Sequence, residues 1–325
     1  MHITRDITFE LTLKCNLSCN MCSRQFLADK SSSLDFALIE KVLDDLASPG
    51  CEDFRFSFGG YGEPLSYPRL LDAIRLVKSR MPDSPLTITT NGHLLTAAMA
   101  DRLLDSGLDY LRVSLNATTS EEYRRLMNSE RHAVVEANLR RLLERKRETG
   151  VKMKVGIQIL DTIVNKANYA DYKSAWLPLF SDNDFMTYRF MENRGGTIDS
   201  TSLSSGSSPG HLANRWPCFA LWRYLAIDTL GRVYCCCEAY TFREQPTLLL
   251  LGSLDQTSIL EIIDSAQLKE VREMHLRNDY SRIPECAHCT KPLNYPNVWR
   301  LEGENWEWRE EAPTPSSIDS PAMTD

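Results

Sequence analysis

The sequence predicts an α/β fold with a parallel sheet, followed by a small cysteine-rich C-terminal region. Two observations lead to this fold class. Short runs rich in β-forming residues alternate with amphipathic segments up to about residue 190, and nine of the ten cysteines are grouped. A strand-helix-strand pattern repeated about six times is typical of right-handed βαβ units. A chain of 325 residues is long enough for one large core and an appendage.

The individual elements follow from side-chain type and spacing. Strands are predicted where short runs are rich in β-branched and aromatic residues, at residues 6–13, 53–60, 85–92, 110–117, 153–160 and 185–191. Helices are predicted where apolar side chains recur at helical spacing, at residues 35–47, 67–81, 95–107 and 134–150. Such a sheet is either open and doubly wound or curved into a partial barrel. Both forms place ligands at the carboxyl ends of the strands.

Composition changes divide the chain into four predicted regions. Residues 1–197 form the α/β core, and residues 198–213 are a Ser/Gly-rich junction. Residues 214–295 form the cysteine-rich subdomain, in which Asp228 to Arg232 is the turn between two strands. Residues 296–325 form an acidic tail, rich in Pro and Ser, that we expect to be disordered at its end.

Charge and hydropathy narrow the choice of partner and compartment. The formal net charge is -7 with both signs interspersed, so neither nucleic acid nor an anionic membrane surface is an expected partner. No apolar stretch is long enough to cross a bilayer. We therefore expect a cytoplasmic protein acting on a small molecule. Reducing thiol pools oppose structural disulfides there, which favours metal binding or redox chemistry for the cysteines.

Three cysteines, Cys15, Cys19 and Cys22, lie within eight positions directly after the first strand, with no fourth cysteine nearby. Thiolates bind soft metals, and a closed zinc or iron-sulfur site usually takes four of them. Three leave one metal position open, which is typical of a catalytic site. A zinc loop or a chance group of surface cysteines is the alternative.

The Cys-x3-Cys-x2-Cys pattern resembles that of the radical S-adenosylmethionine (SAM) superfamily. The resemblance implies a partial (β/α)6 TIM-like barrel whose three cysteines hold a 4Fe-4S cluster, with SAM on the fourth iron. It also implies an external one-electron donor, such as a flavodoxin or ferredoxin, and cleavage of SAM to a 5'-deoxyadenosyl radical. Met21 stands where that family often has an aromatic residue, and its thioether can pack against adenine.

Polar motifs follow the later strands and strengthen the resemblance. They are GGYGEPL at residues 59–65, TTNG at 89–92 and SLNA at 114–117. By the resemblance these segments contact SAM, and the predicted cofactor-binding residues are Tyr61, Gly62, Glu63, Asn91, Ser114, Asn116 and, more weakly, Gln158 on the fifth strand. Taken singly, such residues are commonly turn, cap or hydrogen-bonded core residues.

The second cysteine set is Cys218, Cys236, Cys286 and Cys289, which supply a closed count of four thiolates. Zinc and iron-sulfur fit such a site equally well on chemistry alone. Cys-x12-Gly-x4-Cys followed by Cys-x2-Cys resembles the twitch subdomain, a short form of the SPASM domain that holds one auxiliary 4Fe-4S cluster. Side chains alternate along a strand, so the neighbouring Cys235 and Cys237 are expected to face away from Cys236. The alternative is a register slip, which would make one of these two the ligand.

The segment at residues 192–200, ENRGGTIDS, resembles one in the deoxy-scyllo-inosamine dehydrogenases, which are twitch enzymes of butirosin biosynthesis. By that resemblance Arg194 contacts the reacting hydroxyl. Because its guanidinium stays charged, we expect Arg194 to polarise a developing alkoxide rather than act as a base. An exposed Arg-Gly-Gly turn is the alternative.

These features predict an oxidoreductase. A radical that removes hydrogen from a carbinol, beside a cluster that accepts an electron, converts a secondary alcohol into a ketone. The expected substrate is a sugar, aminocyclitol or nucleoside-like molecule of secondary metabolism, as in antibiotic biosynthesis.

Other functions remain open. A peptide epimerase or crosslinking enzyme would use Cys235, Cys237 or Cys51 as a thiol hydrogen donor, but the loop begins at Cys15 and leaves no room upstream for a leader-recognition domain. A sugar-nucleoside decarboxylase, a carbon-carbon bond-forming enzyme and a zinc-stabilised binding protein are the further alternatives.

Overall fold

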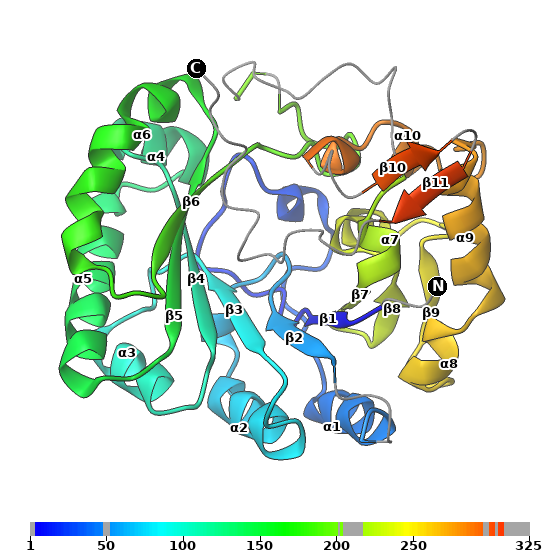
Figure 1. Ribbon diagram of the computed structural model, residues 1–325, viewed down its shortest axis with the longest axis horizontal. Helices are drawn as coiled ribbons and strands as arrows, with labels where there is room; N and C mark the ends of the chain where they lie inside the picture. Colours follow the sequence, from blue (N-terminus) through cyan, green and yellow to red (C-terminus); the bar gives the residue numbers. More distant parts are fainter. Residues whose placement is uncertain are drawn as a thin grey trace.

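The computed structural model contains a nine-stranded sheet in the order β6-β5-β4-β3-β2-β1-β7-β8-β9 (Figure 1). The structure describes residues 4–47, 53–200, 202–203, 217–294, 299–302 and 305–308. Cys51 lies outside these described residues, as do much of the predicted junction and most of the predicted tail. The boundaries at residues 197, 213 and 295 therefore stay predictions.

The first six strands confirm the predicted parallel core. They are β1 (Asp6–Phe9), β2 (Arg55–Phe58), β3 (Leu86–Thr90), β4 (Tyr110–Asn116), β5 (Lys154–Leu160) and β6 (Phe185–Arg189), and each pairs in parallel with the next. The clearest differences in length are in β1 and β2, which have 4 residues each where the sequence predicts eight. Beyond Phe9 the chain turns into a loop that pairs with its own return, where Thr12 bridges Ser33 in antiparallel fashion.

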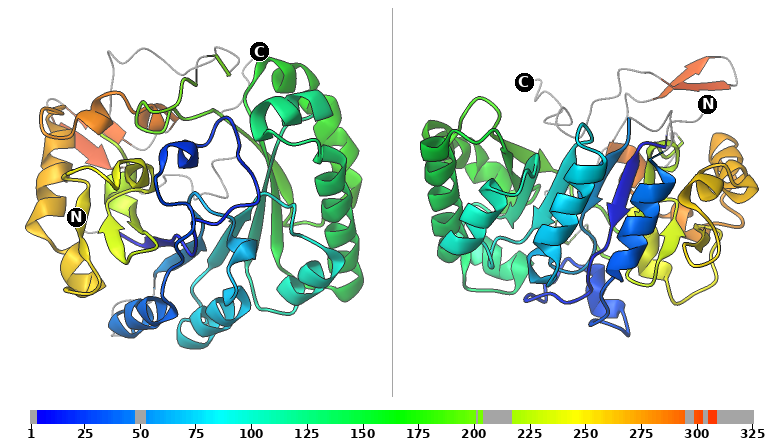
Figure 2. Two further views of the ribbon diagram at one scale, coloured as in Figure 1. Left: turned by 180° about the vertical axis from the view of Figure 1, so that it is seen from behind. Right: turned by 90° about the horizontal axis from the view of Figure 1, so that it is seen from below.

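Helices cover the outer side of this sheet, as Figures 1 and 2 show. Four of them match the predicted segments: α1 (Phe36–Asp45), α2 (Leu70–Arg80), α3 (Ala97–Leu104) and α5 (His132–Thr149). The structure adds α4 (Ser120–Met127), α6 (Ile163–Trp176) and the short 3-10 helices η1 (Ser23–Phe26), η2 (Pro64–Ser66) and η3 (Leu177–Leu179). Hydroxyl and carboxylate caps begin α1, α3, α4 and α6: the side chains of Asp35, Thr96, Thr119 and Thr162 accept backbone N–H groups.

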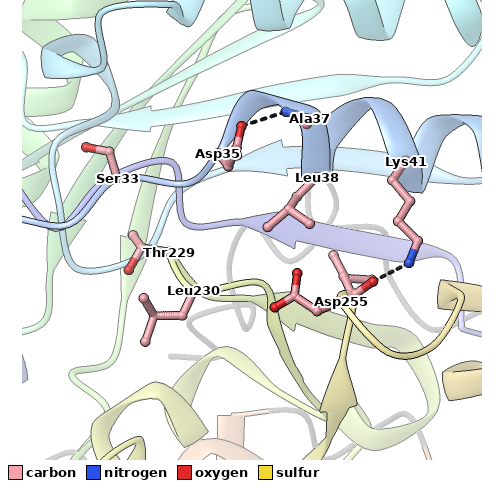
Figure 3. Close-up of a pocket in the computed structure, with 9 residues that line it drawn as sticks. Ser33, Asp35, Ala37, Leu38, Lys41, Thr229, Leu230 and Asp255 are labelled. Carbon is pink, nitrogen blue, oxygen red and sulfur yellow. Dashed lines mark hydrogen bonds between the residues drawn. The ribbon is translucent and has the colours of Figure 1, made fainter.

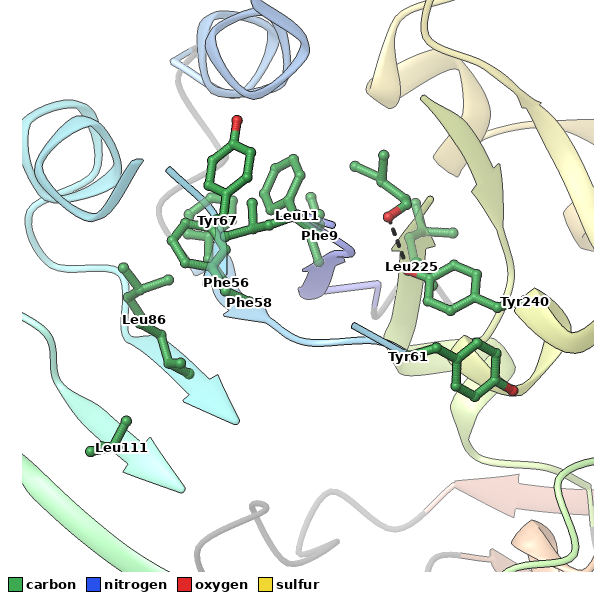
Figure 4. Close-up of a cluster of buried hydrophobic side chains, with 14 of the residues drawn as sticks. Phe9, Leu11, Phe56, Phe58, Tyr61, Tyr67, Leu86, Leu111, Leu225 and Tyr240 are labelled. Carbon is green, nitrogen blue, oxygen red and sulfur yellow. Dashed lines mark hydrogen bonds between the residues drawn. The ribbon is translucent and has the colours of Figure 1, made fainter. Parts of the chain in front are cut away.

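Aromatic side chains fill the space beneath β1 and β2. The ring of Phe9 lies 6.4 Å from that of Phe56 and 6.1 Å from that of Phe58, and all three side chains are buried (Figure 4). Burying a Phe side chain contributes about 1.5–3 kcal/mol to stability. This packing fixes the carboxyl ends of the two strands from which the three-cysteine loop and the GGYGEPL motif depart.

The C-terminal region continues the same sheet. Strand β7 (Tyr224–Ile227) pairs in parallel with β1, while β8 (Arg232–Tyr234) and β9 (Leu250–Ser253) add to it in antiparallel fashion. The predicted turn between β7 and β8 is confirmed: the N–H of Gly231 donates to the carbonyl of Asp228 at 3.0 Å, with Gly231 at φ 76°. The hairpin is thus an extension of the barrel sheet and not a separate layer.

The remaining elements surround this extension. They are α7 (Ala220–Arg223), η5 (Cys237–Phe242), α8 (Ile259–Ile263), α9 (Ala266–Leu276), α10 (Pro284–Ala287), η6 (Lys291–Asn294) and a two-stranded ribbon of β10 (Trp299–Glu302) and β11 (Asn305–Trp308). None of the helices within the described ranges is long and apolar enough to cross a bilayer.

Candidate active site

The three-cysteine loop lies inside the opening of the curved sheet, where Figures 1 and 2 draw it in blue. Side-chain and backbone hydrogen bonds fix its path. Asn20 donates through Nδ2 to the carbonyl of Arg125 at 2.7 Å, at the end of α4. Arg24 donates through Nε to the carbonyl of Leu13 at 2.7 Å. The loop is therefore attached to α4 between Cys19 and Cys22, and the bond from Arg24 to Leu13 joins its two ends.

The three predicted ligands lie near one another. Burial raises the pKa of the Cys19 thiol above its ordinary value, and the neighbouring thiols of Cys22 and Cys15 add to the effect. Burial likewise raises the pKa of the Cys15 and Cys22 thiols, which accept backbone N–H groups from Leu17 and Arg24 respectively. All three residues are only partly buried. The loop thus presents three close thiols with access from outside.

The GGYGEPL motif packs directly on this loop. A Cβ on Gly62 would lie 1.8 Å from the carbonyl oxygen of Thr12, so only glycine fits there. The next residue, Glu63, donates its N–H to the carbonyl of Lys14 at 2.8 Å. Tyr61 is also placed here: its N–H donates to the carboxylate of Glu10 at 2.9 Å, and its ring is buried. The motif therefore contacts the loop through its backbone, at Gly62 and at the N–H of Glu63.

Glu63 joins the motif to the end of β3. Its buried carboxylate accepts three hydrogen bonds: from the Leu65 N–H at 3.0 Å, the Thr90 hydroxyl at 2.6 Å and the Asn91 N–H at 2.8 Å. Burial raises the pKa of Glu63, and these three donors oppose that effect. The carboxylate thus orders the second and third strand ends relative to each other.

Asn91 extends the connection to the cysteines. Its Nδ2 donates to Asn16 Oδ1 at 2.8 Å and lies 3.8 Å from Cys15 Sγ. Farther along the sheet, Ser114 on β4 is in register with Gln158 on β5, and Gln158 Nε2 donates to Asn116 Oδ1 at 3.1 Å. The predicted SAM residues therefore come from four successive strand ends on one edge of the sheet.

The second cysteine set also converges. Burial raises the pKa of the Cys218 thiol, with further contributions from Cys289 and Cys236. It raises that of Cys286, with contributions from Cys236, Cys289 and Cys218. It raises the pKa of Cys289 to about 12. These four thiols come from three places in the fold: just before α7, at the start of η5, and within and just after α10.

The expectation that Cys235 faces away from Cys236 is wrong. Strand β8 ends at Tyr234, so the strict alternation of a strand does not extend over the three consecutive cysteines. A hydrogen bond joins the Cys235 and Cys236 thiols, which lowers the pKa of Cys236 and raises that of Cys235. Cys237 differs: its thiol donates to Glu238 Oε1 at 3.6 Å. Cys237 thus has a carboxylate partner, whereas the other two thiols pair with each other.

Arg194 lies between the two sets. It has a left-handed backbone with φ 51°, and its Nη1 donates to both carboxylate oxygens of Glu238, at 2.8 and 3.0 Å. Its positive charge acts on the thiols of Cys22 and of Cys237, in each case against the effect of burial. The Arg194 side chain is 40% exposed, but its guanidinium is paired at 2.8 Å with the buried carboxylate of Glu238.

The segment that carries Arg194 touches both cysteine regions. Asn193 and Thr290 exchange hydrogen bonds, from each backbone N–H to the other side chain at 3.0 Å. On the other side, the Thr197 and Ser23 hydroxyls lie 3.0 Å apart. This segment therefore links the second set, through the residue after Cys289, to the first, through the residue after Cys22.

Sequence reasoning missed several charged residues here. Glu238 and Lys291 belong to no motif, yet both are buried beside Arg194, together with Glu192. A second missed pair, Glu10 with Arg243, joins the end of β1 to η5 at 2.7 Å. In the sequence these residues are distinguished only by lying close to a cysteine or to a strand end. Charged residues at such places are too common for this to identify them.

A cavity of about 550 Å³ lies elsewhere, outside the sheet between α1 and the β7–β8 turn (Figure 3). Leu38, Lys41 and Thr229 are among its lining residues, and no predicted site residue lines it. It plays no part in the site.

The two thiol groups fit iron-sulfur clusters. No three His, Cys, Asp or Glu side chains in the described part of the chain are arranged to hold a single metal ion. In a 4Fe-4S cluster each thiolate binds a different iron, so close but separate thiols suit it. The first group is partly exposed and leaves one ligand position open, whereas the second has four thiols, three of them buried.

A partial barrel with one open and one closed thiol site defines an iron-sulfur enzyme. The family model described as the radical SAM superfamily matches residues 9–163, and that of the SPASM iron-sulfur cluster-binding domain matches residues 218–290. The chain belongs to the radical SAM superfamily and carries a C-terminal SPASM/twitch domain. Its cofactors are SAM, the SAM-binding 4Fe-4S cluster and an auxiliary iron-sulfur cluster.

Similar proteins fall into several functional groups. The chain is 34% identical over 150 residues to the tungsten-containing aldehyde ferredoxin oxidoreductase cofactor-modifying protein of Pyrococcus furiosus, covering 46% of this chain and 40% of that relative. The structure resembles BtrN in complex with AdoMet and 2-DOIA, with a TM-score of 0.59 and 17% identity over 88% of this chain and 93% of BtrN.

It also resembles Streptococcus suis SuiB bound to its precursor peptide SuiA, with a TM-score of 0.62 and 14% identity over 84% of this chain and 67% of SuiB. At these identities the likeness to BtrN and SuiB shows the fold. The chain also spans less than half the length of the P. furiosus relative. The substrate must therefore be argued from the site.

Proposed function

We propose that this enzyme dehydrogenates a secondary alcohol of a small polar molecule, namely a sugar, an aminocyclitol or a nucleoside-like compound of cytoplasmic secondary metabolism. The observation that carries the proposal is the place of Arg194. Its guanidinium acts on Cys22 of the open site and on Cys237, which adjoins Cys236 of the closed site. A hydroxyl bound there would have the radical source on one side and an electron acceptor on the other.

Each group of residues has a role in this proposal. Cys15, Cys19 and Cys22 hold the SAM-binding cluster. Tyr61, Gly62, Glu63, Asn91, Ser114, Asn116 and Gln158 form the SAM pocket, in which Glu63 acts by ordering strand ends. When bound, SAM supplies the radical that removes a hydrogen atom from the carbinol carbon, and its cluster takes electrons from a donor such as a flavodoxin or ferredoxin.

Arg194 stabilises the oxygen of the substrate as it loses its proton, because a fixed guanidinium favours negative charge at a bound oxygen. The carbon radical then gives up one electron and becomes the ketone carbon. The thiols of Cys218, Cys236, Cys286 and Cys289 hold the acceptor of that electron. Loss of one hydrogen atom, one proton and one electron balances the oxidation.

Cys236 is the preferred ligand among the three consecutive cysteines. Its thiol accepts a backbone N–H from Ala239, as the Cys218 thiol does from Ala220 and the Cys289 thiol from Lys291. Hydrogen bonds to sulfur are among the features that tune iron-sulfur clusters. This shared pattern supports Cys236, with Cys235 as an adjacent packed thiol.

The test is turnover under strictly anaerobic conditions. The protein is reconstituted with iron and sulfide, supplied with SAM and dithionite, and incubated with 2-DOIA, myo-inositol or a nucleoside. We expect equal amounts of ketone and 5'-deoxyadenosine with at least one compound, and loss of the ketone in Arg194→Gln. Deoxyadenosine without ketone from any hydroxylated compound would eliminate the dehydrogenase and leave the superfamily membership intact.

A second candidate is peptide modification, favoured by one observation. The Cys237 thiol is partly exposed beside Glu238, with the Arg194 charge acting on it, so it is available as a hydrogen donor to a carbon radical. An epimerase would incorporate solvent deuterium into a peptide, and Cys237→Ala would abolish this incorporation. Mass spectrometry of peptides incubated in D2O separates this activity from dehydrogenation.

A further inference from the structure

A buried lysine stands beside the second cysteine set. Lys291 begins η6, two residues after Cys289, and its side chain is only 9% exposed. Its Nζ lies 3.2 Å from Glu192 Oε2 and 3.2 Å from Glu238 Oε1. Two carboxylates from distant parts of the chain thus hold one ammonium group in place.

Lys291 is also attached to the thiols themselves. Its backbone N–H donates to the thiol of Cys289. Its positive charge acts on Cys218, Cys236 and Cys237, in each case opposing the rise in thiol pKa that burial or neighbouring acidic groups produce. Lys291 therefore acts on two thiol-bearing segments through its ammonium group and on a third, at Cys289, through its backbone N–H.

The carboxylates act on the thiols with the opposite sign. Glu238 and Glu192 both disfavour the thiolate form of Cys289, whose pKa is raised chiefly by burial. Charges interact strongly here because the surroundings are buried and poorly screened. The field at the thiols is a balance between two carboxylates and two cations, Lys291 and Arg194, which both contact Glu238 Oε1.

We infer that Lys291 raises the reduction potential of the auxiliary cluster and so makes it an effective electron acceptor. A cluster held by four thiolates gains negative charge on reduction, and a nearby cation stabilises the reduced form. Net charge, hydrogen bonds to sulfur and solvent exposure are the factors that set such potentials. Lys291 supplies a positive charge and a hydrogen bond to the sulfur of Cys289, and it lies where solvent exposure is low.

Fold stability alone is a poor reason for this lysine. Burying an ammonium group is costly, and replacing a buried ion pair with apolar side chains is often neutral or stabilising. The lysine is therefore better explained by its effect on the cluster than by its contribution to folding. The inference rests on the four-thiol assignment and the electron-acceptor role of the proposed function, and not on the identity of the substrate.

The experiment is a redox titration without substrate. To observe only the auxiliary cluster, all variants carry Cys15→Ala, Cys19→Ala and Cys22→Ala. The fraction of reduced cluster is followed by electron paramagnetic resonance at set potentials. In Lys291→Met we expect the ratio of reduced to oxidised cluster to fall at least about tenfold at a fixed potential, equivalent to about 59 mV for one electron.

Two further variants separate charge from structure. Lys291→Arg keeps the charge and should stay within about threefold of the parent, a smaller change than the tenfold step of 59 mV. Glu192→Gln removes an opposing charge and should shift the ratio upward. Lys269→Met serves as the control, because Lys269 is 54% exposed and pairs with Asp264 at the surface. It should leave the ratio unchanged.

Opposite shifts in Lys291→Met and Glu192→Gln support the inference. Shifts of the same sign, or clusters in both variants that titrate like the parent, overturn it. If Lys291→Met does not bind iron, Glu192→Gln is the deciding variant. A ratio of reduced to oxidised cluster that is unchanged or lower in Glu192→Gln overturns the inference. Since no substrate is present, a failed inference leaves the proposed dehydrogenase to be judged by its own ketone assay.

Discussion

The two cysteine sites are built in opposite ways. The first takes its three thiols from eight consecutive residues of one loop, and these residues are partly exposed. The second gathers four thiols from three separate segments between residues 218 and 289, and three of its four predicted ligands are buried. The first site can therefore lose a thiol without losing a contact between distant segments, whereas the second cannot.

This difference suggests that the first site serves the reaction, whereas the second also stabilises the fold. An open site on a loop admits a cosubstrate, and its geometry depends on hydrogen bonds from strand ends such as those of Glu63 and Asn91. A closed site ties together the segment before α7, the start of η5 and the final knuckle, and admits no further ligand. We expect variants of the first site to affect activity first and variants of the second to affect folding as well.

The largest effect is expected at the open site. Cys15→Ala removes one of only three protein ligands, so formation of 5'-deoxyadenosine should fall to the background of iron-free protein. The melting temperature of the apo protein should change by no more than about 2 °C, since Cys15 is partly exposed. Chromatography of the SAM products and differential scanning fluorimetry measure the two effects. A large drop in melting temperature would contradict the contrast between the sites.

The closed site should respond differently. Cys218→Ala should lower the iron content of the purified protein by about half, because one of two clusters is lost. It should also lower the melting temperature, because a metal site that joins distant segments contributes to folding. The matched control is Cys235→Ala, a buried thiol outside the predicted ligand set. If Cys235→Ala loses the iron and Cys236→Ala keeps it, the ligand assignment is wrong.

A smaller effect is expected where a carboxylate orders the strand ends. Glu63→Gln keeps the shape but gives an amide that can accept fewer of the bonds from Leu65, Thr90 and Asn91. We expect SAM binding to weaken about tenfold, from the loss of about 1.5 kcal/mol of charge-assisted hydrogen bonding. Isothermal titration with SAM measures this. Unchanged affinity with full cluster content would show that Glu63 does not position the pocket.

The smallest effect concerns stability and pH. Burial alone would raise the pKa of Glu238, but Arg194 and Lys291 hold it well below its ordinary value of 4.5. A lowered pKa stabilises the fold above the ordinary value, and this stability is lost as the pH falls through the lowered pKa. Glu238→Gln should therefore destabilise the protein by about 2 kcal/mol at pH 7, discounted for the partial exposure of Arg194.

Denaturant unfolding of both proteins checks this expectation. The difference in free energy should be constant between pH 6 and pH 7 and should shrink once the pH falls below about 4.5, where the unfolded state takes up a proton. A difference that grows on acidification would have the wrong sign for an ion pair.

The sequence predicted the elements and motifs that depend on local pattern. All six core strands and the hairpin turn at Asp228 to Gly231 are present, because alternation and turn chemistry act over a few residues. Order along the chain also placed the strand-end motifs correctly, since parallel strands bring their carboxyl ends to one edge.

Features that arise from packing could not be predicted. The place of the Cys235 thiol depends on where β8 ends, and the pairing of β7 with β1 joins residues more than two hundred positions apart. The buried charges of Glu192, Glu238 and Lys291 meet only after the barrel and the C-terminal region are assembled. No spacing rule in a single sequence reports such contacts.

The parallel pairing of β1 with β7 has a practical consequence for engineering. A chain cut before residue 217 would leave the backbone of β1 as an unpaired edge and would also remove Arg223 from Asp6 and Arg243 from Glu10. Such a fragment should self-associate instead of behaving as an independent domain. Exchanging C-terminal regions between relatives therefore requires exchanging the residues of β1 that face β7 as well, since backbone hydrogen bonds join these two strands.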